Sequence, residues 1–409
     1  MEFTHSDRSI ALRQEAQRFL DQHVYPAEPV FEEQAAAHRA AGQPFLSPEI
    51  FAPLKEEARR RGLWNLFLRD SEYGPGLSVL DYAPIAELSG RSPLIAPEAM
   101  NCSAPDTGNM ELLAMFATPE QRKQWLEPLL RGEIRSCFSM TEPDVASSDA
   151  SNIALTITAD GDDYVVNGRK WWSSGAMRPD CKVAIVMGVS DPDAERFRRH
   201  SMILVPLDTA GVTIERSTTV FGYDDGDHGG HAVINYDHVR VPRESLLGSQ
   251  GGGFTMAQAR LGPGRIHHCM RTLGMAERAL ELMCQRALSR STFGTPLAKH
   301  GIAQEWIAES RLAIEQARLL VLKAAWLIDS VGVKNARTEV AAIKIAAPRA
   351  ASYVLDRAIQ VHGAAGVSGD TPLAATWARL RGLHLADGPD EVHLRSVARE
   401  ELRRHSHGS

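Results

Sequence analysis

The spacing of hydrophobic positions changes twice along the chain and divides it into three segments. From residue 1 to about residue 135, apolar residues recur every three or four positions, and the same helical spacing returns from about residue 246 to residue 409. Between them, apolar and polar residues alternate, which is the spacing of half-buried strands. The pattern predicts a helical domain at 1–135, a β domain at 136–245 and a second helical domain at 246–409.

Cap signals mark helix ends in the first segment. Thr118 is followed three residues later by Gln121, which is the order of a capping box. Gly132 is a suitable helix stop because glycine adopts the left-handed conformation at low cost. Ser47, which stands before Pro48, predicts another helix start.

Turn signals divide the middle segment into strands. Asp160-Gly161-Asp162 and Asn167-Gly168 each follow an alternating run, which predicts two tight hairpins. Further alternating runs follow, so we expect at least six short strands. The last segment holds three or four long amphipathic runs, which predict an antiparallel helical bundle.

Composition and charge narrow the class of protein. The 409 residues are 44% hydrophobic and 23% charged, with a net charge of −6. This balance gives no basic surface for nucleic acid, and no apolar run approaches a membrane span. The first residues lack a signal-peptide profile, and the five cysteines are scattered without a CxxC pair. We expect a soluble cytoplasmic protein with no nucleic-acid partner and no membrane insertion.

Two stretches of the middle segment carry candidate chemistry. Hydroxyl and carboxyl side chains dominate between Thr141 and Ser151. Such a loop suits phosphates, carbonyls or heterocycle edges, although taken alone it is more typical of a polar domain boundary. Trp171 and Trp172 are adjacent, so on a strand one ring faces the core while the other can present its flat face to a ligand. Two purely structural tryptophans are the alternative.

The last segment contains a crowded acidic run, "LADGPDEVHLRSVARE", at residues 385–400. From these residues alone, Asp387 is either the cap of a helix or a catalytic carboxylate. Several histidines lie nearby, but none belongs to an HExxH motif, so we expect no metal site. They are His267, His268, His362, His384 and His393.

Six motifs, in order along nearly the whole chain, resemble the acyl-CoA dehydrogenase family. They are "MTEPDVASSD", "KWWSSG", "RLGPGR", "SRSTFGTPLAKH", "QVHGAAG" and "ADGPDEVH…ARE". The resemblance implies a mainly α fold with a central β domain: an N-terminal helical domain, a β-barrel-like middle domain and a C-terminal four-helix bundle. The forms "TEPDVASSD" and "DGPDEVH" resemble a subfamily whose animal members carry this module fused to a kinase-like domain.

The resemblance implies that FAD lies between the middle domain and the bundle. Backbone groups and the Thr141 hydroxyl would meet the pyrimidine edge of the flavin, where reduction places negative charge. Trp172 would pack against the ring, with Ser174 near flavin N5. The flavin contacts implied in the middle domain are Phe138, Ser139, Met140, Thr141, Trp172, Ser173 and Ser174.

A second set of implied FAD contacts lies in the bundle. Arg290 resembles the arginine that reaches the FAD pyrophosphate of a neighbouring subunit, for which the guanidinium fork is suited. The segment "QVHGAAG" would approach that same cofactor, so a homodimer or homotetramer is expected. The remaining implied contacts are Gln360, Gly363, Ala364, Pro389, Asp390 and Glu391.

The same resemblance places an acyl-CoA thioester beside the flavin. Ser148, or Ser147 in its place, would touch the pantetheine, and Arg399 would lie near the far end of the CoA chain. The motif "GPGR" would lie beside the CoA chain, immediately before the first long bundle helix. The implied substrate contacts are Ser148, Gly262, Pro263, Gly264, Arg265, Gly388 and Arg399.

Asp387 occupies the position where most relatives have a catalytic glutamate. Some relatives place the base one residue before the motif arginine, but here that residue is Gly264. The resemblance therefore implies that Asp387 removes the α-proton, that the β-hydrogen leaves as hydride to flavin N5, and that an electron-transfer flavoprotein accepts the electrons. The alternatives are a flavin oxidase of the same fold, acting on acyl-CoA or nitroalkanes, and a non-catalytic flavin- or CoA-binding module.

Overall fold

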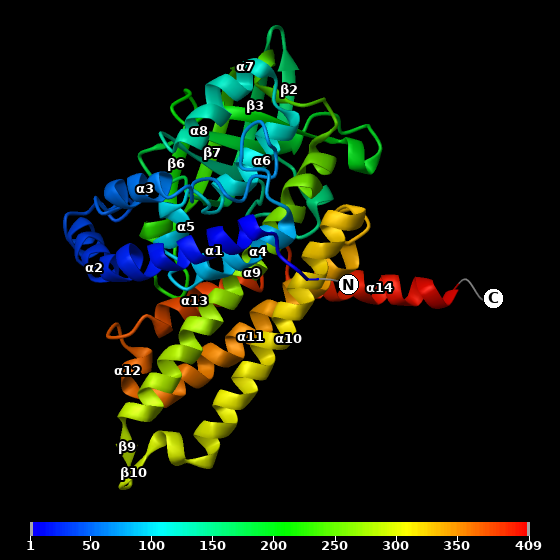
Figure 1. The fold of residues 1–409 in the computed structure, drawn as a ribbon. Helices are drawn as coiled ribbons and strands as arrows, with labels where there is room; N and C mark the ends of the chain where they lie inside the picture. The colour runs from blue at the N-terminus through cyan, green and yellow to red at the C-terminus, as the bar shows by residue number, and fades with distance from the viewer. Residues whose placement is uncertain (1–2, 407–409) are drawn as a thin grey trace.

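The computed structural model describes residues 3–406, and for Asp227 and Pro263 only the backbone. Helices precede and follow one central sheet, so the predicted mainly α fold class with a central β unit is confirmed (Figure 1). No helix within residues 3–406 is both long and apolar enough to cross a membrane. The division into three folding domains at residues 135 and 245 stays a prediction.

The first segment is helical up to Arg131. Its longer helices are α1 (Asp7–Phe19), α2 (Tyr25–Ala40), α3 (Phe51–Arg60), α4 (Val79–Gly90) and α6 (Asp106–Phe116). Its short helices are α5 (Ala96–Ala99), α7 (Pro119–Gln121) and α8 (Glu127–Arg131).

Two of the predicted helix ends are confirmed. Thr118 and Gln121 exchange both hydrogen bonds of a capping box, and Gly132 ends α8 in the left-handed conformation. The predicted start at Ser47 is wrong, because α3 begins at Phe51. There the Gln34 side chain accepts the Ile50 amide at 2.9 Å and thereby fixes the entry of the helix.

The middle segment forms an eight-stranded sheet in the order β6-β7-β3-β2-β4-β5-β8, with β1 pairing parallel to β4. The strands are β1 (Arg135–Ser139), β2 (Thr156–Asp160), β3 (Asp163–Ser174), β4 (Cys181–Val189), β5 (His200–Pro206), β6 (Val212–Thr218), β7 (His231–Pro242) and β8 (Leu246–Leu247).

One predicted hairpin is confirmed and the other is wrong. Asp160 pairs with Asp163 across a tight turn between β2 and β3. At Asn167-Gly168, however, β3 continues, and the register with β7 shifts by a bulge. A Cβ at residue 168 would lie 3.0 Å from the Leu155 Cα, so this glycine permits close backbone approach instead of a turn.

The last segment is a bundle of long helices. They are α9 (Gly253–Ser289), α10 (Gly301–Val331), α11 (Arg337–His362), α13 (Leu373–Leu383) and α14 (Asp390–Ser406). The short α12 (Ala364–Val367) and the β9–β10 hairpin (Ser291–Thr292, Thr295–Pro296) lie at the end of the bundle remote from the sheet, and α14 projects sideways (Figure 1). The "GPGR" motif lies inside α9 and not before it, which corrects the expected helix start.

The first helical segment and the bundle share one hydrophobic core. Buried residues of α1, α4 and α6 belong to the same cluster as buried residues of α9, α10 and α11. A second cluster lies within the sheet unit, and a third lies in the remote half of the bundle. Because the two helical segments are packed together, they form a rigid wall against which the sheet is placed.

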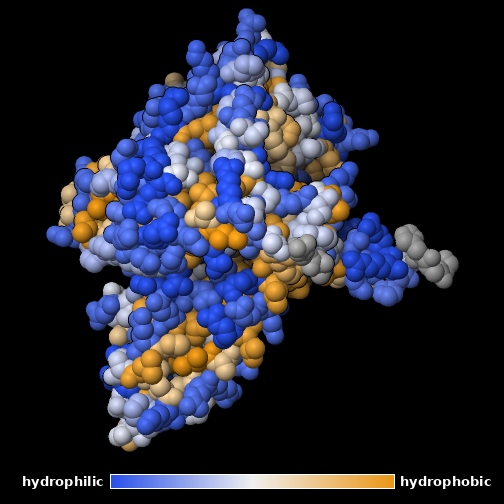
Figure 2. Space-filling model, viewed as in Figure 1, coloured by the Kyte–Doolittle hydropathy of each residue, from blue (hydrophilic) through white to orange (hydrophobic). Residues whose placement is uncertain are grey.

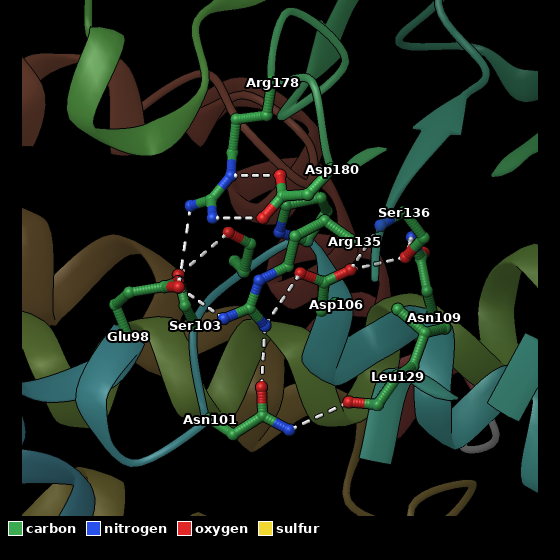
Figure 3. A network of polar contacts seen from close by, with 12 residues as sticks. Glu98, Asn101, Ser103, Asp106, Asn109, Leu129, Arg135, Ser136, Arg178 and Asp180 are labelled. Carbon is green, nitrogen blue, oxygen red and sulfur yellow. Dashed lines mark hydrogen bonds and ion pairs between the residues drawn. The ribbon is translucent and has the colours of Figure 1, made fainter. Parts of the chain in front are cut away.

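A buried ion network joins the sheet to the first helical segment (Figure 3). Arg135, which begins β1, forms an ion pair with Glu98 and donates to the Asn101 side chain at 2.7 Å. Asp106 accepts the Ser136 backbone N–H at 2.8 Å. The Arg135 and Glu98 side chains are only 3% and 7% exposed, so each charge depends on its partners.

The network keeps Glu98 ionised. Burial alone would raise the pKa of the Glu98 carboxyl, but the charges of Arg135 and Lys55 outweigh burial and hold that pKa well below its usual range. Removing one of these cations would leave an uncompensated negative charge in the interior.

We expect Arg135→Met to lower the free energy of unfolding by about 3–5 kcal/mol, because it breaks a buried pair on one side only. Urea denaturation would measure this. Arg240→Met is the matched control, since Arg240 is 56% exposed beside Asp160 and an exposed pair contributes about 0–1 kcal/mol. An Arg135→Met loss no larger than that of the control would contradict this account.

Candidate active site

A groove of 2420 Å³ lies where the sheet, α9 and the last two helices meet. Its walls come from the ends of β1 and β3, the first third of α9, and the segment that joins α13 to α14. Pockets for drug-sized ligands occupy about 300–1,000 Å³, so this groove has room for two large ligands in contact. The predicted site residues can therefore be located relative to one shared cavity.

Asp387 lies in the wall of the groove with a strained backbone. Its φ is 55°, a conformation that non-glycine residues adopt rarely. Arg265 Nε donates to the Asp387 carbonyl at 3.0 Å, and His393 Nε2 lies 3.3 Å from the same oxygen. Gly388 follows with φ 104°, and a Cβ there would lie 3.0 Å from the His393 ring. The carbonyl is thus held from two sides while the carboxylate faces the groove.

The Asp387 carboxylate is not a helix cap in the part of the chain that the structure describes. The ionisable group nearest to it is His268, whose Nε2 lies 3.6 Å from Oδ2. A Cβ on Gly264 would lie 3.6 Å from the same oxygen, so the absence of a side chain there leaves room in front of the carboxylate. The side chain is 16% exposed and remains open to a ligand.

Electrostatics keep this carboxylate ionised. Burial alone would raise the pKa of Asp387, but the imidazole of His268 and the guanidiniums of Arg260 and Arg265 outweigh it, so the pKa is lowered from its ordinary value. Burial lowers the pKa of His268 to about 4, so near neutral pH this ring is uncharged and available for hydrogen bonding. The arrangement can hold a deprotonated acid ready to take a proton.

Arg260 is a site residue that no motif or spacing singled out. Its Nε donates to the Asn109 side chain at 2.9 Å, and its guanidinium lies 4.0 Å from the centre of the Phe138 ring. Glu111 lies within the electrostatic reach of Arg260, and burial raises the pKa of Glu111 to about 8. His268 was also missed as a neighbour of Asp387, because both contacts join residues that are more than a hundred positions apart.

Two tryptophans, Trp171 and Trp172, form an aromatic wall of the same groove. The prediction that one ring faces the core is wrong, because a bulge between Lys170 and Ser173 breaks the alternation and both rings line the groove. Trp172 has φ 55° and is 39% exposed. The buried residue is instead Lys170, whose Nζ donates to the Met140 carbonyl at 2.7 Å and to Glu142 at 2.9 Å. Lys170 thereby fixes the end of β1 beside the tryptophans.

The polar loop after β1 is fastened by Glu142. Its carboxylate accepts the amides of Ala154 and Leu155 at 2.9 and 2.8 Å. The Ser147 hydroxyl accepts the Glu142 amide and closes the loop, whereas Ser148 is exposed at the groove. Ser147 is therefore occupied structurally, and Ser148 is the more available of the two.

Many of the predicted residues share the groove. The following line it: Phe138, Met140, Thr141, Ser148, Trp172, Ser174, Gly262, Gly264, Arg265, Asp387, Gly388, Pro389 and Arg399. Pro263 lies in the backbone of α9 between two of these glycines, and its side chain is outside what the structure describes.

Other predicted residues lie elsewhere. The buried hydroxyls of Ser139 and Ser173 lie 2.8 Å apart in a hydrogen bond within the sheet. The Asp390 carboxylate pairs with His384 at 3.0 Å, and neither Asp390 nor Glu391 lines the groove. A last group lies at or toward the remote end of the bundle (Figure 1). Its members are Arg290, Gln360, Gly363 and Ala364.

Comparison with known proteins gives matches along the whole chain. Models of the acyl-CoA dehydrogenase N-terminal, middle and C-terminal domains match residues 6–133, 137–234 and 251–402. The probable acyl-CoA dehydrogenase FadE2 of Mycobacterium tuberculosis is 58% identical over 99% of this chain and 98% of its own. Acyl-CoA dehydrogenase family member 11 of Gallus gallus is 56% identical over 94% of this chain, which spans 49% of that protein. A solved structure from Mycobacterium abscessus has a TM-score of 0.95 at 51% identity, and covers 98% of this chain and 100% of its own.

We expect stability to fall as pH rises from about 5 to about 8, because Glu111 stays protonated when folded but ionises when unfolded. Its pKa moves from 4.5 to about 8 on folding, so the unfolded chain holds fewer protons in this interval, at a cost on the order of 4 kcal/mol. Glu111→Gln should remove most of this pH dependence in urea denaturation. Glu305→Gln, at an exposed position of α10, is the control. Equal pH profiles for the wild type and Glu111→Gln would contradict the assignment.

Proposed function

The chain belongs to the acyl-CoA dehydrogenase family, a family of oxidoreductases, and from this premise we propose that it is an FAD-dependent enzyme that desaturates acyl-CoA thioesters with Asp387 as the base. The observation that carries the proposal is the Asp387 carboxylate, which is ionised, open to the groove, and not used to cap α14. A carboxylate held this way suits removal of an α-proton made acidic by a thioester.

The residues of the groove fit a flavin. Trp172 offers an exposed ring face, which suits packing against an isoalloxazine. The end of β1 is fixed by Lys170, so its backbone groups at Phe138 and Met140 are preorganised for the pyrimidine edge. When bound, FAD would supply the hydride acceptor for the β-hydrogen. Ser174 lies at the same wall and would face N5.

Asp387 would act on the thioester through two of its groups, the backbone N–H and the side-chain carboxylate. Within residues 3–406 the Asp387 backbone N–H donates to no protein acceptor, so it is available to polarise the thioester carbonyl. The Asp387 carboxylate would take the α-proton. Aspartate is shorter than glutamate by one C–C bond, about 1.5 Å, and the space in front of Gly264 would let the substrate come closer to compensate.

Positive side chains extend the groove along α14. Arg395, Arg399 and Arg403 line its outer part and are exposed. Guanidinium groups bind phosphates through paired hydrogen bonds, so this stretch would hold the nucleotide half of CoA. Arg265 instead holds the Asp387 carbonyl, so its contribution to substrate would be indirect.

The remote end of the bundle would pack against a second copy. Figure 2 shows a broad hydrophobic area on the lower part of the molecule, where the bundle lies. Several large apolar side chains are exposed on this segment, and a contiguous exposed apolar surface marks an interaction site. They include Leu288, Phe293, Ile302, Leu312, Leu319, Tyr353 and Val367. If a second copy packed there, Arg290 and Gln360 of one subunit would lie near the cofactor of the other subunit, as the homo-oligomer prediction requires.

We expect Asp387→Asn to lower kcat/KM by about 10²–10⁴-fold, the usual contribution of a general base. The rate of flavin bleaching after anaerobic mixing of the FAD-loaded protein with each of a panel of acyl-CoAs would measure it. Asp356→Asn, an exposed acid on α11, is the control. Bleaching of Asp387→Asn at the wild-type rate with FAD retained would mean that another group is the base, and no bleaching in the wild type would favour a binding module.

The same-fold oxidase is distinguished by oxygen. We expect the acyl-CoA-reduced wild type to pass its electrons to an electron-transfer flavoprotein and to form little hydrogen peroxide without it. Peroxide release at the rate of substrate consumption, measured with a peroxidase-coupled dye, would replace the dehydrogenase assignment with the oxidase.

A further inference from the structure

A chain of hydrogen bonds runs beside the aromatic wall of the groove. Ser174 Oγ lies 2.8 Å from His231 Nδ1, and His231 Nε2 lies 3.0 Å from Asp225 Oδ2. Arg379 Nε donates to the other carboxylate oxygen, Asp225 Oδ1, at 2.8 Å. The four residues come from β3, β7, the loop between β6 and β7, and α13, and all line the groove.

The residues of this hydrogen-bond chain are held rigidly. The side chains of Asp225 and His231 are 6% and 14% exposed, and Asp225 has φ 49°. The His231 backbone is fixed at both groups, since its N–H donates to Ser217 Oγ and its carbonyl accepts from Thr218 Oγ1. A strained, buried residue with fixed neighbours indicates a built arrangement rather than a chance contact.

The charge of Asp225 determines which His231 nitrogen carries the proton. Burial alone would raise the pKa of Asp225, but the hydrogen bond from His231 and the charge of Arg379 hold that pKa well below its usual range. A permanent carboxylate accepts a hydrogen from Nε2, so in the neutral ring Nδ1 is an acceptor. Ser174 then donates its hydroxyl hydrogen to His231 and presents only oxygen lone pairs to the groove.

Protonation of His231 reverses this direction. In the imidazolium form Nδ1 also carries a hydrogen and donates to Ser174 Oγ. The Ser174 hydroxyl hydrogen is then released toward the groove. One proton on His231 therefore converts Ser174 from an acceptor into a donor without moving a heavy atom.

We propose that His231 is a positioning residue that sets the direction of the Ser174 hydroxyl toward bound flavin, so that the protonation of His231 and the redox state of the flavin are linked. This rests on the proposed function, in which Ser174 faces flavin N5. An oxidised flavin offers an acceptor at that nitrogen and favours the donor form of Ser174. A reduced flavin offers an N–H and favours the acceptor form.

The linkage has a definite sign. Since reduction favours neutral His231, it releases a proton from the ring to solvent, and by reciprocity protonated His231 favours the oxidised flavin. Asp225 and Arg379 belong to the hydrogen-bond chain, and His228 acts electrostatically on Asp225. Arg178 lies under the same turn, where a Cβ on Gly229 would meet its side chain.

The order Ser-His-Asp also occurs in hydrolases, but the ring is reversed here. In hydrolases Nε2 faces the serine and Nδ1 faces the acid, whereas here Nδ1 faces Ser174. Intact-mass analysis after incubation with an acyl-CoA separates the two roles. An acyl adduct that disappears in Ser174→Ala would overturn the proposal in favour of a nucleophile.

The test is the pH dependence of the flavin midpoint potential between about pH 5 and 8, where histidines titrate. For every two electrons, we expect the wild type to take up as much as one proton fewer than His231→Gln and Ser174→Ala. The midpoint potential of the wild type should therefore fall less steeply with pH. Ser174→Ala removes the hydroxyl but keeps His231 with Asp225, and Ser174→Thr should restore the wild-type slope. His238→Gln is the control, because His238 lies on the same strand with a side chain that is 76% exposed.

Each outcome decides the proposal. A wild-type slope with no proton release in this interval overturns it, as do equal slopes in all variants. A change in His231→Gln without one in Ser174→Ala overturns it as well, because His231 would then act by another route. A wild type that binds no FAD, or is not bleached by any acyl-CoA, defeats the proposed function itself, whereas a bleached wild type with unchanged variant slopes defeats only this inference.

Discussion

The site depends on keeping one carboxylate charged inside the wall of a deep groove. Asp387 is sheltered enough for burial to oppose its ionisation, yet its pKa is lowered because cationic groups on α9 outweigh burial. Those groups are themselves fixed: Arg260 by Asn109 of the first helical segment, and Arg265 by the Asp387 carbonyl. The shared core of the two helical segments therefore does more than stabilise the fold, because it holds the charges that keep this carboxylate ionised.

The periodicity was sufficient to predict the order of helices and strands. The 3.6-residue and two-residue spacings are local properties, and burial of one face preserves them in the folded chain. The errors fall where a tertiary contact overrides a local signal. Gly168 is the clearest example, because an Asn-Gly pair typical of a turn is used to let Leu155 approach the backbone of a continuous strand. Gln34 similarly displaces the expected helix start by accepting the Ile50 amide.

In the candidate site too, some residues could be predicted from the sequence and others could not. Asp387, Trp172 and Ser174 could be selected because the order of motifs resembles a family, and the structure brings all three to one groove. Arg260, His268 and His231 carry no local signature, since their chemistry comes from partners distant in sequence. The bulge beside Trp172 was equally hidden, because the alternation rule assumes a regular strand and gives no warning of an inserted residue.

The Arg379–Asp225 pair joins a bundle helix to the sheet across the groove. A hinge motion that separated the bundle from the sheet would have to break this ion pair. The Asp225 carboxylate that orients His231 would then lose its contact with Arg379, and the Ser174 hydroxyl would lose its preferred direction. Widening the groove and loosening the hydrogen-bond chain at Ser174 would thus be one mechanical event.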